Sequence, residues 1–294
     1  MKNKVSIKSR LGDWFVYTTL ILIGFFTIYP IIYVISMSVS SQDAVLGNKV
    51  ILWPIGFTLD SYEKVLLENR SIWMAYFNTI WYVVVGTAFN LFLTITCAYA
   101  LSRNNFFARK FFMSFFVFTM LFSGGLIPLF ILVNKLGLYD TRWCIVLMSG
   151  CSVWNVIITK VFFQNDIPES LFESAKIDGY TDIGILIKIV LPLSKQIIAI
   201  VALFCAVSFW NGYFCPMIFL KSNNLKPLQL ILMETLIQNN NALAGDASNY
   251  LRRMLYLMQI KYVVIIVSIV PIMCVYPFIQ KYFVKGVMIG SVKG

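Results

Sequence analysis

The polar segment Gln164–Tyr180 holds the residues whose chemistry is easiest to interpret, because apolar stretches flank it on both sides. Its Glu173 carboxylate can accept a charge-assisted hydrogen bond from a basic residue of another protein. That chemistry binds a partner and makes or breaks no covalent bond. The segment therefore indicates docking.

A short helix is predicted to position Glu173. Asp166 can cap it together with Glu169 three residues later, and Pro168 suits a first turn. Gly179 can adopt the left-handed conformation that ends helices. We expect about three turns. The flank expected to share one face consists of Ile167, Leu171, Ser174, Ala175 and Asp178.

Trp210, Asn211 and Tyr213 lie in an otherwise apolar stretch. Aromatic faces stack on pyranose rings and amides pair with hydroxyl groups, so these side chains could line a path for a sugar. Hydrogen bonding between helices and interface packing would use the same residues. Both interpretations stay open on the sequence alone.

A second polar segment lies within residues 221–261. Its run of amides, Gln238 to Asn241, is followed up to Asn249 by Ala, Gly and Ser among others. These side chains are short, favour flexible loops and can compete for sugar hydroxyls. A plain connector is the alternative, although long loops are more often functional.

Residue types that enzymes and ion carriers need are scarce. The chain has no histidine, and none of its 6 cysteines forms a CxxC pair, which disfavours imidazole bases and zinc sites. No acidic residue falls inside the apolar stretches, so an ion-coupled secondary transporter and a membrane-embedded enzyme or scaffold are the weaker alternatives. No GxxxxGK[ST] sequence is present to bind nucleotide. We expect no catalytic residue, no metal and no cofactor bound by this chain.

Composition predicts an all-α membrane protein. Of the 294 residues, 59% are hydrophobic and 13% are charged, whereas about a quarter are charged in a soluble domain. Stretches of roughly 20 apolar residues can cross a bilayer as helices. We expect six, at about 14–37, 77–101, 111–133, 143–163, 191–220 and 262–283.

Basic residues predict the orientation. The N-terminal tail and the turn 103–110 are rich in Lys and Arg and would lie on the same side, which the positive-inside rule makes cytoplasmic. Both termini are then expected inside. The rule also explains the net charge of +11 better than nucleic-acid binding does. The first stretch is too long for a signal peptide and lacks a small-x-small cleavage site, so we expect it to be retained.

The segment around Glu173 also matches a family pattern. Glu173-Ser174-Ala175, then Gly179 after three residues and Ile189-Val190-Leu191-Pro192 after nine more, resembles the EAA loop (E-A-A-x3-G-x9-I-x-L-P) of binding-protein-dependent importer permeases. Ser174 replaces the middle alanine, a change between small residues that is compatible with docking.

The resemblance extends over nearly the whole chain to the maltose-G-type carbohydrate permeases of ATP-binding-cassette (ABC) importers. Within them it is similar to the polysaccharide and lipoprotein-linked subgroup, which includes permeases for rhamnogalacturonan- and alginate-derived oligosaccharides. The residues that carry it are Phe57 to Tyr62, Asn78-Thr79, Phe209-Trp210-Asn211 and Tyr276 to Gly286.

This resemblance implies a type I importer permease with a MetI-like fold, six transmembrane helices and a cytoplasmic coupling helix. Its implied partners are a second permease in a heterodimer, an ATPase dimer that uses ATP and Mg²⁺, and an extracytoplasmic solute-binding protein. The implied substrate is an oligosaccharide, with uronate-bearing fragments of polysaccharides the favoured class. The residues that the resemblance assigns to ATPase coupling are Glu173, Ser174, Ala175, Gly179, Leu191 and Pro192.

In maltose-G-type permeases, the segment equivalent to Gln238–Asn249 reaches the sugar cleft of the binding protein. The resemblance therefore makes Asn239, Asn240 and Asn241 candidates for that contact. We expect a tail, first helix and outer segment over residues 1–75, a permease core over 76–285, and a cytoplasmic tail over 286–294. The expected location is a bacterial plasma membrane.

Overall fold

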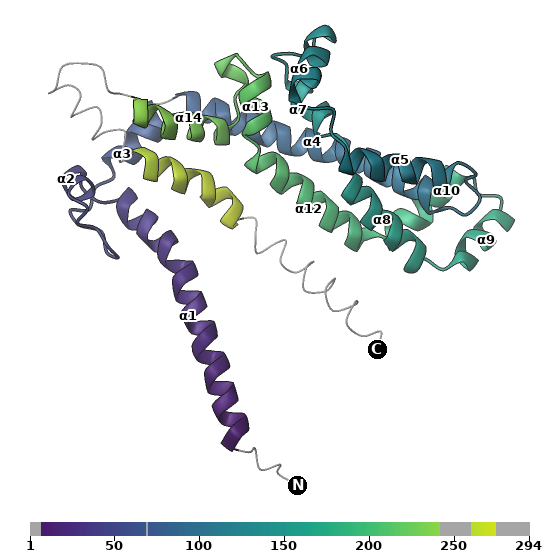
Figure 1. Cartoon of the computed structure of the whole chain (residues 1–294), viewed down its shortest axis with the longest axis horizontal. Coiled ribbons are helices and arrows are strands. Elements are labelled where there is room, and N and C mark those ends of the chain that lie inside the picture. The colour runs from purple at the N-terminus through teal and green to yellow at the C-terminus, as the bar shows by residue number, and fades with distance from the viewer. Residues whose placement is uncertain (1–6, 69, 242–259, 275–294) are drawn as a thin grey trace. The chain divides into compact units, whose positions relative to one another are not determined.

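The computed structural model describes residues 7–68, 70–241 and 260–274, which form helices joined by turns and contain no strand (Figure 1). The chain divides into two compact units. Among the described residues, one unit contains 7–68, 70, 232–241 and 260–271, and the other contains 71–231 and 272–274. Each unit therefore joins segments that are far apart in the sequence.

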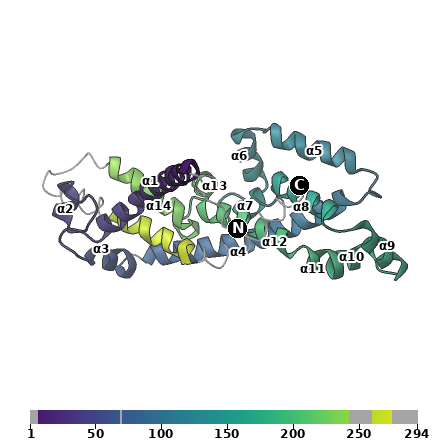
Figure 2. The ribbon, with the colours of Figure 1, turned by 90° about the horizontal axis from the view of Figure 1, so that it is seen from below.

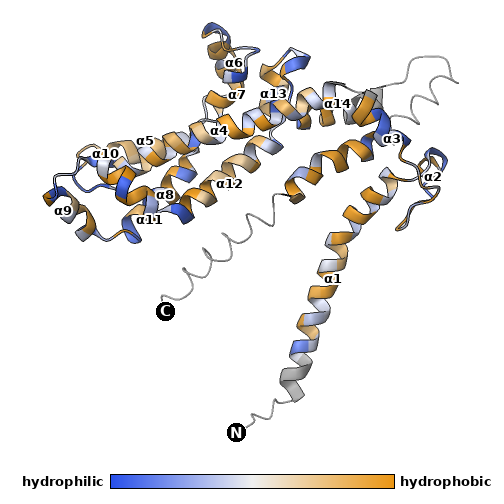
Figure 3. Ribbon diagram, turned by 180° about the vertical axis from the view of Figure 1, so that it is seen from behind, coloured by the Kyte–Doolittle hydropathy of each residue, from blue (hydrophilic) through white to orange (hydrophobic). Residues whose placement is uncertain are grey.

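In the first unit, α1 (Ile7–Ser38) consists largely of hydrophobic residues (Figure 3). Many of their side chains are exposed. Trp14, Phe15 and Phe26 each expose at least 70% of their surface. Hydrophobic side chains on all sides of a helix suit a membrane environment. The short elements that follow are α2 (Gln42–Leu46), α3 (Asp60–Glu63) and a π-helical turn, η1 (Lys64–Glu68).

The C-terminal end of α1 packs against α2 and the loop that follows it. Met37, Ala44, Val45 and Val50 form a small buried cluster there. The hydroxyl of Ser36 donates a hydrogen bond to a backbone carbonyl of the same loop, that of Leu52, at 2.6 Å. The unit thus has a compact apolar centre at the end of a long lipid-facing helix.

The second unit is organised around the 33-residue helix α4 (Arg70–Ser102). Helices α8 and α12 lie side by side, and α5 contacts α8 (Figure 1). The remaining elements are α5 (Arg109–Leu121), α6 (Leu126–Lys135), α7 (Arg142–Met148), α8 (Val153–Asn165), α9 (Glu169–Ile177), α10 (Asp182–Ile185), η2 (Leu186–Val190), α11 (Leu191–Leu193), α12 (Lys195–Asn211), α13 (Phe214–Phe219) and η3 (Asn223–Leu225). The last helix, α14 (Leu228–Asn241), begins in this unit, and its residues from Leu232 on belong to the first unit. Figure 2 shows α9, α10 and α11 together at one end of this unit.

Two predicted spans are confirmed as single helices long and apolar enough to cross a membrane, at Gly12–Ser38 and Ser71–Ser102. Three further spans are possible if each of three bent helix pairs is counted as one. These pairs are Arg109–Leu121 with Leu126–Lys135 (112°), Arg142–Met148 with Val153–Asn165 (51°), and Asp182–Leu193 with Lys195–Asn211 (84°). A shorter apolar helix, Ile260–Cys274, lies in the region of the sixth prediction.

The prediction of one continuous helix over 191–220 is wrong. The chain bends near Ser194, ends α12 at Asn211, and resumes as α13 after Gly212 and Tyr213. Within the predicted span 111–133, Gly125 has φ +88°, a conformation that side chains other than glycine rarely adopt, so the helix is interrupted there.

Candidate functional site

Helix α9 carries Glu173 at the surface, as docking requires. Phe172 and Ala175 are buried, with 3% and 4% of their surface exposed, whereas Glu173 and Ser174 are exposed. The predicted flank is therefore only partly right. Ile167 and Ala175 are buried, but Leu171, Ser174 and Asp178 are exposed because Phe172 is the main anchor of this nine-residue helix.

The C-terminal end of α9 was predicted correctly and its N-terminal end was not. Asp166 does not cap it, because this residue ends α8 and the N-cap position of α9 is Pro168. At the other end Gly179 has φ +78°, as predicted. The amide of Gly179 donates to the Lys176 carbonyl (3.1 Å) and that of Tyr180 to the Ala175 carbonyl (3.0 Å). This is the Schellman arrangement, which satisfies carbonyls at a helix end.

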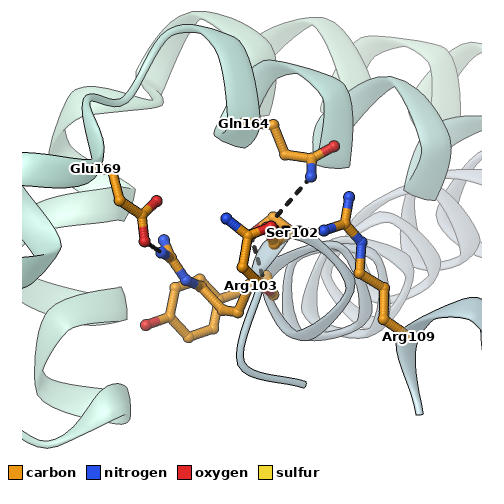
Figure 4. Close-up of polar contacts among 7 residues, drawn as sticks. Ser102, Arg103, Arg109, Gln164 and Glu169 are labelled. Atoms are coloured by element: carbon orange, nitrogen blue, oxygen red, sulfur yellow. Dashed lines mark hydrogen bonds and ion pairs between the residues drawn. The ribbon is translucent and has the colours of Figure 1, made fainter. Parts of the chain in front are cut away.

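Arg103, which directly follows α4, holds the start of α9. Its Nη2 lies 2.5 Å from Glu169 Oε1, and its guanidinium carbon lies 3.4 Å from the centre of the Phe172 ring. Gln164 Nε2 also donates to the Ser102 carbonyl at 3.3 Å (Figure 4). We call Ser102, Arg103, Gln164, Glu169 and Phe172 the α4–α9 clamp. It ties the end of a membrane-length helix to the helix that bears Glu173.

A second contact joins α4 to the segment after α9. The Tyr99 hydroxyl donates to the Asp182 carbonyl at 3.1 Å. Thr181 caps α10 by accepting from the Gly184 amide at 3.2 Å. The chain then passes through η2 and α11 to the 84° bend before α12, with Leu191 half-buried and Pro192 exposed. Movement of α9 can thus reach α4 through the clamp and α12 through this short connection.

Exposed apolar side chains lie on α9 and on the segment that follows it. Ile177 on α9 exposes 86% of its surface, and Ile183 and Ile187 expose 70% and 57%. Isolated surface hydrophobics are common, but three exposed isoleucines within residues 177–187 are suited to binding another protein.

Two of the three candidates for a sugar path share a cavity. Asn211 and Tyr213 line a space of about 240 Å³ together with Tyr82 and Phe209. Trp210 is not among its lining residues. The Trp210 indole N–H is buried and has no hydrogen-bond partner within the described residues.

The amide run lies at the end of the described part of α14. Asn239, Asn240 and Asn241 belong to the last turn of this helix, so the segment predicted to be flexible begins as helix. Residues 242–249 of the same segment lie outside the described residues.

The clamp was missed on the sequence because its members are distant along the chain. Arg103 is 66 residues from Glu169 and was considered only as a charge that sets orientation. No local spacing links the two residues. The sequence offered one signal: a basic residue directly follows a long apolar helix. An acidic and an aromatic residue follow another apolar helix further along the chain.

Comparisons with known proteins give consistent results. Residues 90–289 match the family model described as binding-protein-dependent transport system inner membrane component. The polygalacturonan/rhamnogalacturonan transport system permease protein YtcP of Bacillus subtilis is 42% identical over 98% of this chain and 100% of its own length. Protein LplC of the same organism is 40% identical, over 92% of this chain and 91% of its own. A crystal structure of a bacterial ABC transporter involved in import of the acidic polysaccharide alginate superimposes with a TM-score of 0.86 and 35% identity, covering 95% of this chain and 98% of the other.

Proposed function

Because the chain belongs to the family of binding-protein-dependent transport system inner membrane components, we propose that it pairs with a second permease to form the translocation path of an oligosaccharide importer. An ATPase dimer drives this importer, and an extracytoplasmic solute-binding protein delivers the sugar. The chain itself is a transport subunit. ATP and Mg²⁺ are used by the separate ATPase subunits.

The observation that carries this proposal is the exposure of Glu173 on a helix that the α4–α9 clamp fixes to the end of α4. Residues Glu173, Ser174 and Ala175 with Gly179 form the coupling segment, and Leu191 and Pro192 form its link to α12. Glu173 accepts a charge-assisted bond from a basic ATPase residue, while Ile177 fills an apolar groove beside it. Closure of the ATPase dimer then moves α9, and alternating access follows.

The proposed substrate is an oligosaccharide released from an acidic polysaccharide. The names of YtcP and of the alginate importer support this class, because both refer to polymers of sugar acids. Asn211 and Tyr213 offer an amide and a phenol in one cavity, which suits sugar hydroxyls. Asn239, Asn240 and Asn241 stay candidates for contact with the binding protein.

We also propose how the chain lies in the membrane. The permease core spans residues 76–285, six helices cross the bacterial plasma membrane, and both termini are cytoplasmic. The apolar exterior of α1 and the basic turn after α4 support this orientation.

The test is reconstitution of the complete importer in proteoliposomes, with digalacturonate delivered by the binding protein. Uptake should require ATP inside the vesicle and persist when ionophores dissipate proton and sodium gradients. Uptake that is independent of ATP and abolished by ionophores would make the chain an ion-coupled carrier. Absence of uptake for digalacturonate would overturn the proposed substrate class.

A further inference from the structure

A polar cavity of about 400 Å³ lies in the second unit at the level where the chain between α7 and α8 is not helical. Ser149, Cys151 and Ser152 from this break line it together with Asn90 of α4 and Asn155 of α8. Irregular backbone at membrane depth is tolerated where it borders protein or a water-filled cavity. The break therefore borders a cavity in which water can reach its polar groups.

The wall of this cavity is held by buried amides. Asn90 and Asn155 expose 3% and 6% of their surface. Asn155 Nδ2 donates to Cys205 Sγ (3.4 Å), which donates to Asn90 Oδ1 (3.0 Å), and Asn90 Nδ2 donates to the Ser149 carbonyl (2.9 Å). This network joins α4, α8, α12 and the break, so the wall is fixed in shape.

Two hydroxyl groups on the cavity are left free. Those of Ser149 and Ser208 make no hydrogen bond within the described residues, although both side chains line the space. Neighbouring hydroxyls behave differently, since Thr94 donates to Asn90 Oδ1 and Thr159 donates to the Asn155 carbonyl. Ser149 is half-buried and Ser208 is exposed, so both hydroxyls are open to water or to a ligand.

This cavity shares part of its lining with the one that contains Asn211 and Tyr213. Ser149, Ser208 and Phe209 line both spaces, whose volumes are about 400 and 240 Å³. Together they reach the size range of small-molecule sites, which is about 300–1,000 Å³. Aromatic rings of Trp154 and Phe204 line the larger part, and no charged side chain of the described residues lines either part.

We propose that the two cavities form one groove in this subunit that takes a pyranose ring through its hydroxyl groups and its apolar face, without reading its charge. Ser149, Ser208 and Asn211 provide hydrogen bonds, and the aromatic rings provide stacking surfaces. The carboxylate of a uronate stays hydrated or is recognised outside this chain. The inference rests on the proposed import of oligosaccharides and adds which residues of this subunit contact the sugar.

Two variants of α12 test the groove. Ser208→Phe places a ring where the two cavities meet and should lower digalacturonate uptake more than tenfold. Val207→Phe is the matched control, because Val207 is 42% exposed, lines neither cavity and precedes Ser208 directly. Ser208→Ala removes only the hydroxyl and should raise the KM for uptake roughly two- to tenfold, the effect of one hydrogen bond. Equal uptake by wild type, Ser208→Phe and Ser208→Ala would overturn the proposal.

A native cysteine gives a readout that does not depend on folding of a bulky variant. In a complex where this chain retains only Cys151, which lines the larger cavity, and the buried Cys205, which the wall needs, a membrane-impermeant maleimide should react with Cys151 more slowly when digalacturonate and the binding protein are present during turnover. A complex that retains Cys274 and Cys205 instead should show no such protection, because Cys274 lines neither cavity. Labelling of Cys151 at the same rate with and without sugar would also overturn the proposal.

Charge is tested with a matched pair of sugars, digalacturonate and the neutral α-1,4-galactobiose, each trapped inside vesicles with the assembled importer. Both should protect Cys151 at similar concentrations. Protection by digalacturonate alone would show that the groove reads the carboxylate and would contradict the proposal. If the wild-type importer takes up digalacturonate but Cys151 is never protected, the groove is wrong while the importer assignment stands. If it takes up no digalacturonate, the proposed function fails first.

Discussion

Arg103 Nη2 lies 2.5 Å from Glu169 Oε1, and the same guanidinium covers the ring of Phe172 at 3.4 Å. One side chain therefore contacts α9 twice, through an ion pair at its first residue and through an aromatic ring on its buried face. The Glu169 side chain is 56% exposed, so its ion pair with Arg103 is weak. The contact between Arg103 and the Phe172 ring is shielded from water because Phe172 is buried. Arg103 should therefore contribute more than Glu169 to the stability of the α4–α9 clamp.

Arg103→Ala and Glu169→Ala separate these two contacts. Loss of Glu169 removes an exposed ion pair of about 0.2–1 kcal/mol. Loss of Arg103 also removes a cation–π contact of about 0.5–2 kcal/mol. We expect the melting temperature of the complex to fall more for Arg103→Ala, and the number of ATP molecules hydrolysed per sugar to rise more as well. Equal effects of the two substitutions would show that only the ion pair counts.

A charge reversal provides the control for the clamp. Arg103→Glu alone should weaken coupling, and Arg103→Glu with Glu169→Arg should restore it only in part, because a glutamate at 103 cannot stack on Phe172 in the way a guanidinium does. Full recovery would show that the aromatic contact is dispensable.

Glu173→Lys is expected to uncouple transport without harming the subunit. Glu173 is exposed and makes no hydrogen bond or ion pair within the described residues, so its replacement removes no contact inside the chain. The melting temperature should stay unchanged, while uptake and substrate-stimulated ATP hydrolysis fall at least tenfold. Glu173→Gln should retain more activity than the lysine variant, because an amide still accepts a hydrogen bond. Wild-type uptake by correctly inserted Glu173→Lys would show that Glu173 is not the docking residue.

The features that could be predicted from sequence depend on neighbouring residues. The apolar runs of α1 and α4 predict long helices, and Gly179 three residues after Lys176 predicts the helix end that the structure contains. The cap by Asp166 was predicted on spacing alone. It fails because Asp166 instead follows α8, where its amide donates to the Phe162 carbonyl.

Features that depend on distant contacts could not be predicted in this way. The α4–α9 clamp joins residues of different helices, and Ser149 and Ser208 meet at one cavity only once α7, α8 and α12 are packed. A lone serine in an apolar stretch resembles the many serines that bond to their own helix. Only the absence of such a bond, which is visible in three dimensions, distinguishes these two.

Gly179→Ala should destabilise the end of α9 through backbone strain. No atom lies within 4 Å of a Cβ built on Gly179, so the cost comes from its φ of +78° and amounts to about 1–2 kcal/mol. Gly184→Ala is the control, because this nearby glycine has an ordinary helical conformation and its added Cβ would meet only contacts of 3.4 Å or more. Limited proteolysis of the loop should become faster for Gly179→Ala alone. Unchanged proteolysis would mean that the Schellman turn is not needed to hold α9.

Asp140, in the loop between α6 and α7, predicts a pH dependence of stability. Although desolvation raises its pKa, hydrogen bonds from the Ser222 hydroxyl and from the Ser222 and Lys221 amides, together with the Lys221 charge, hold the pKa of Asp140 below its ordinary value. A lowered pKa in the folded state stabilises the fold above the unfolded-state value of about 3.9, and this contribution is lost as the pH falls through the folded-state value.

The experiment compares melting temperatures of wild type and Asp140→Asn between pH 7 and pH 3. Asn tolerates the φ of +58° found at position 140, so this change removes the charge and leaves the turn possible. Wild type should be the more stable at pH 7, and the difference should shrink toward pH 3. A difference that stays constant with pH would show that the Asp140 charge contributes nothing.

Gly86→Ala tests whether α4 and α12 must approach closely to form the groove. A Cβ on Gly86 would lie 2.4 Å from Cζ of Phe209, which is 7% exposed and lines both cavities. The ring must therefore shift out of its packed position, and the overpacking should cost about 1–3 kcal/mol. Phe209→Leu shortens the side chain and should recover part of the stability in the double variant. Gly24→Ala on α1 is the matched control, because nothing lies within 4 Å of its added Cβ. If Gly86→Ala melts at the wild-type temperature, or if Phe209→Leu adds a further loss without any recovery, the close contact between these two residues does not hold α4 against α12.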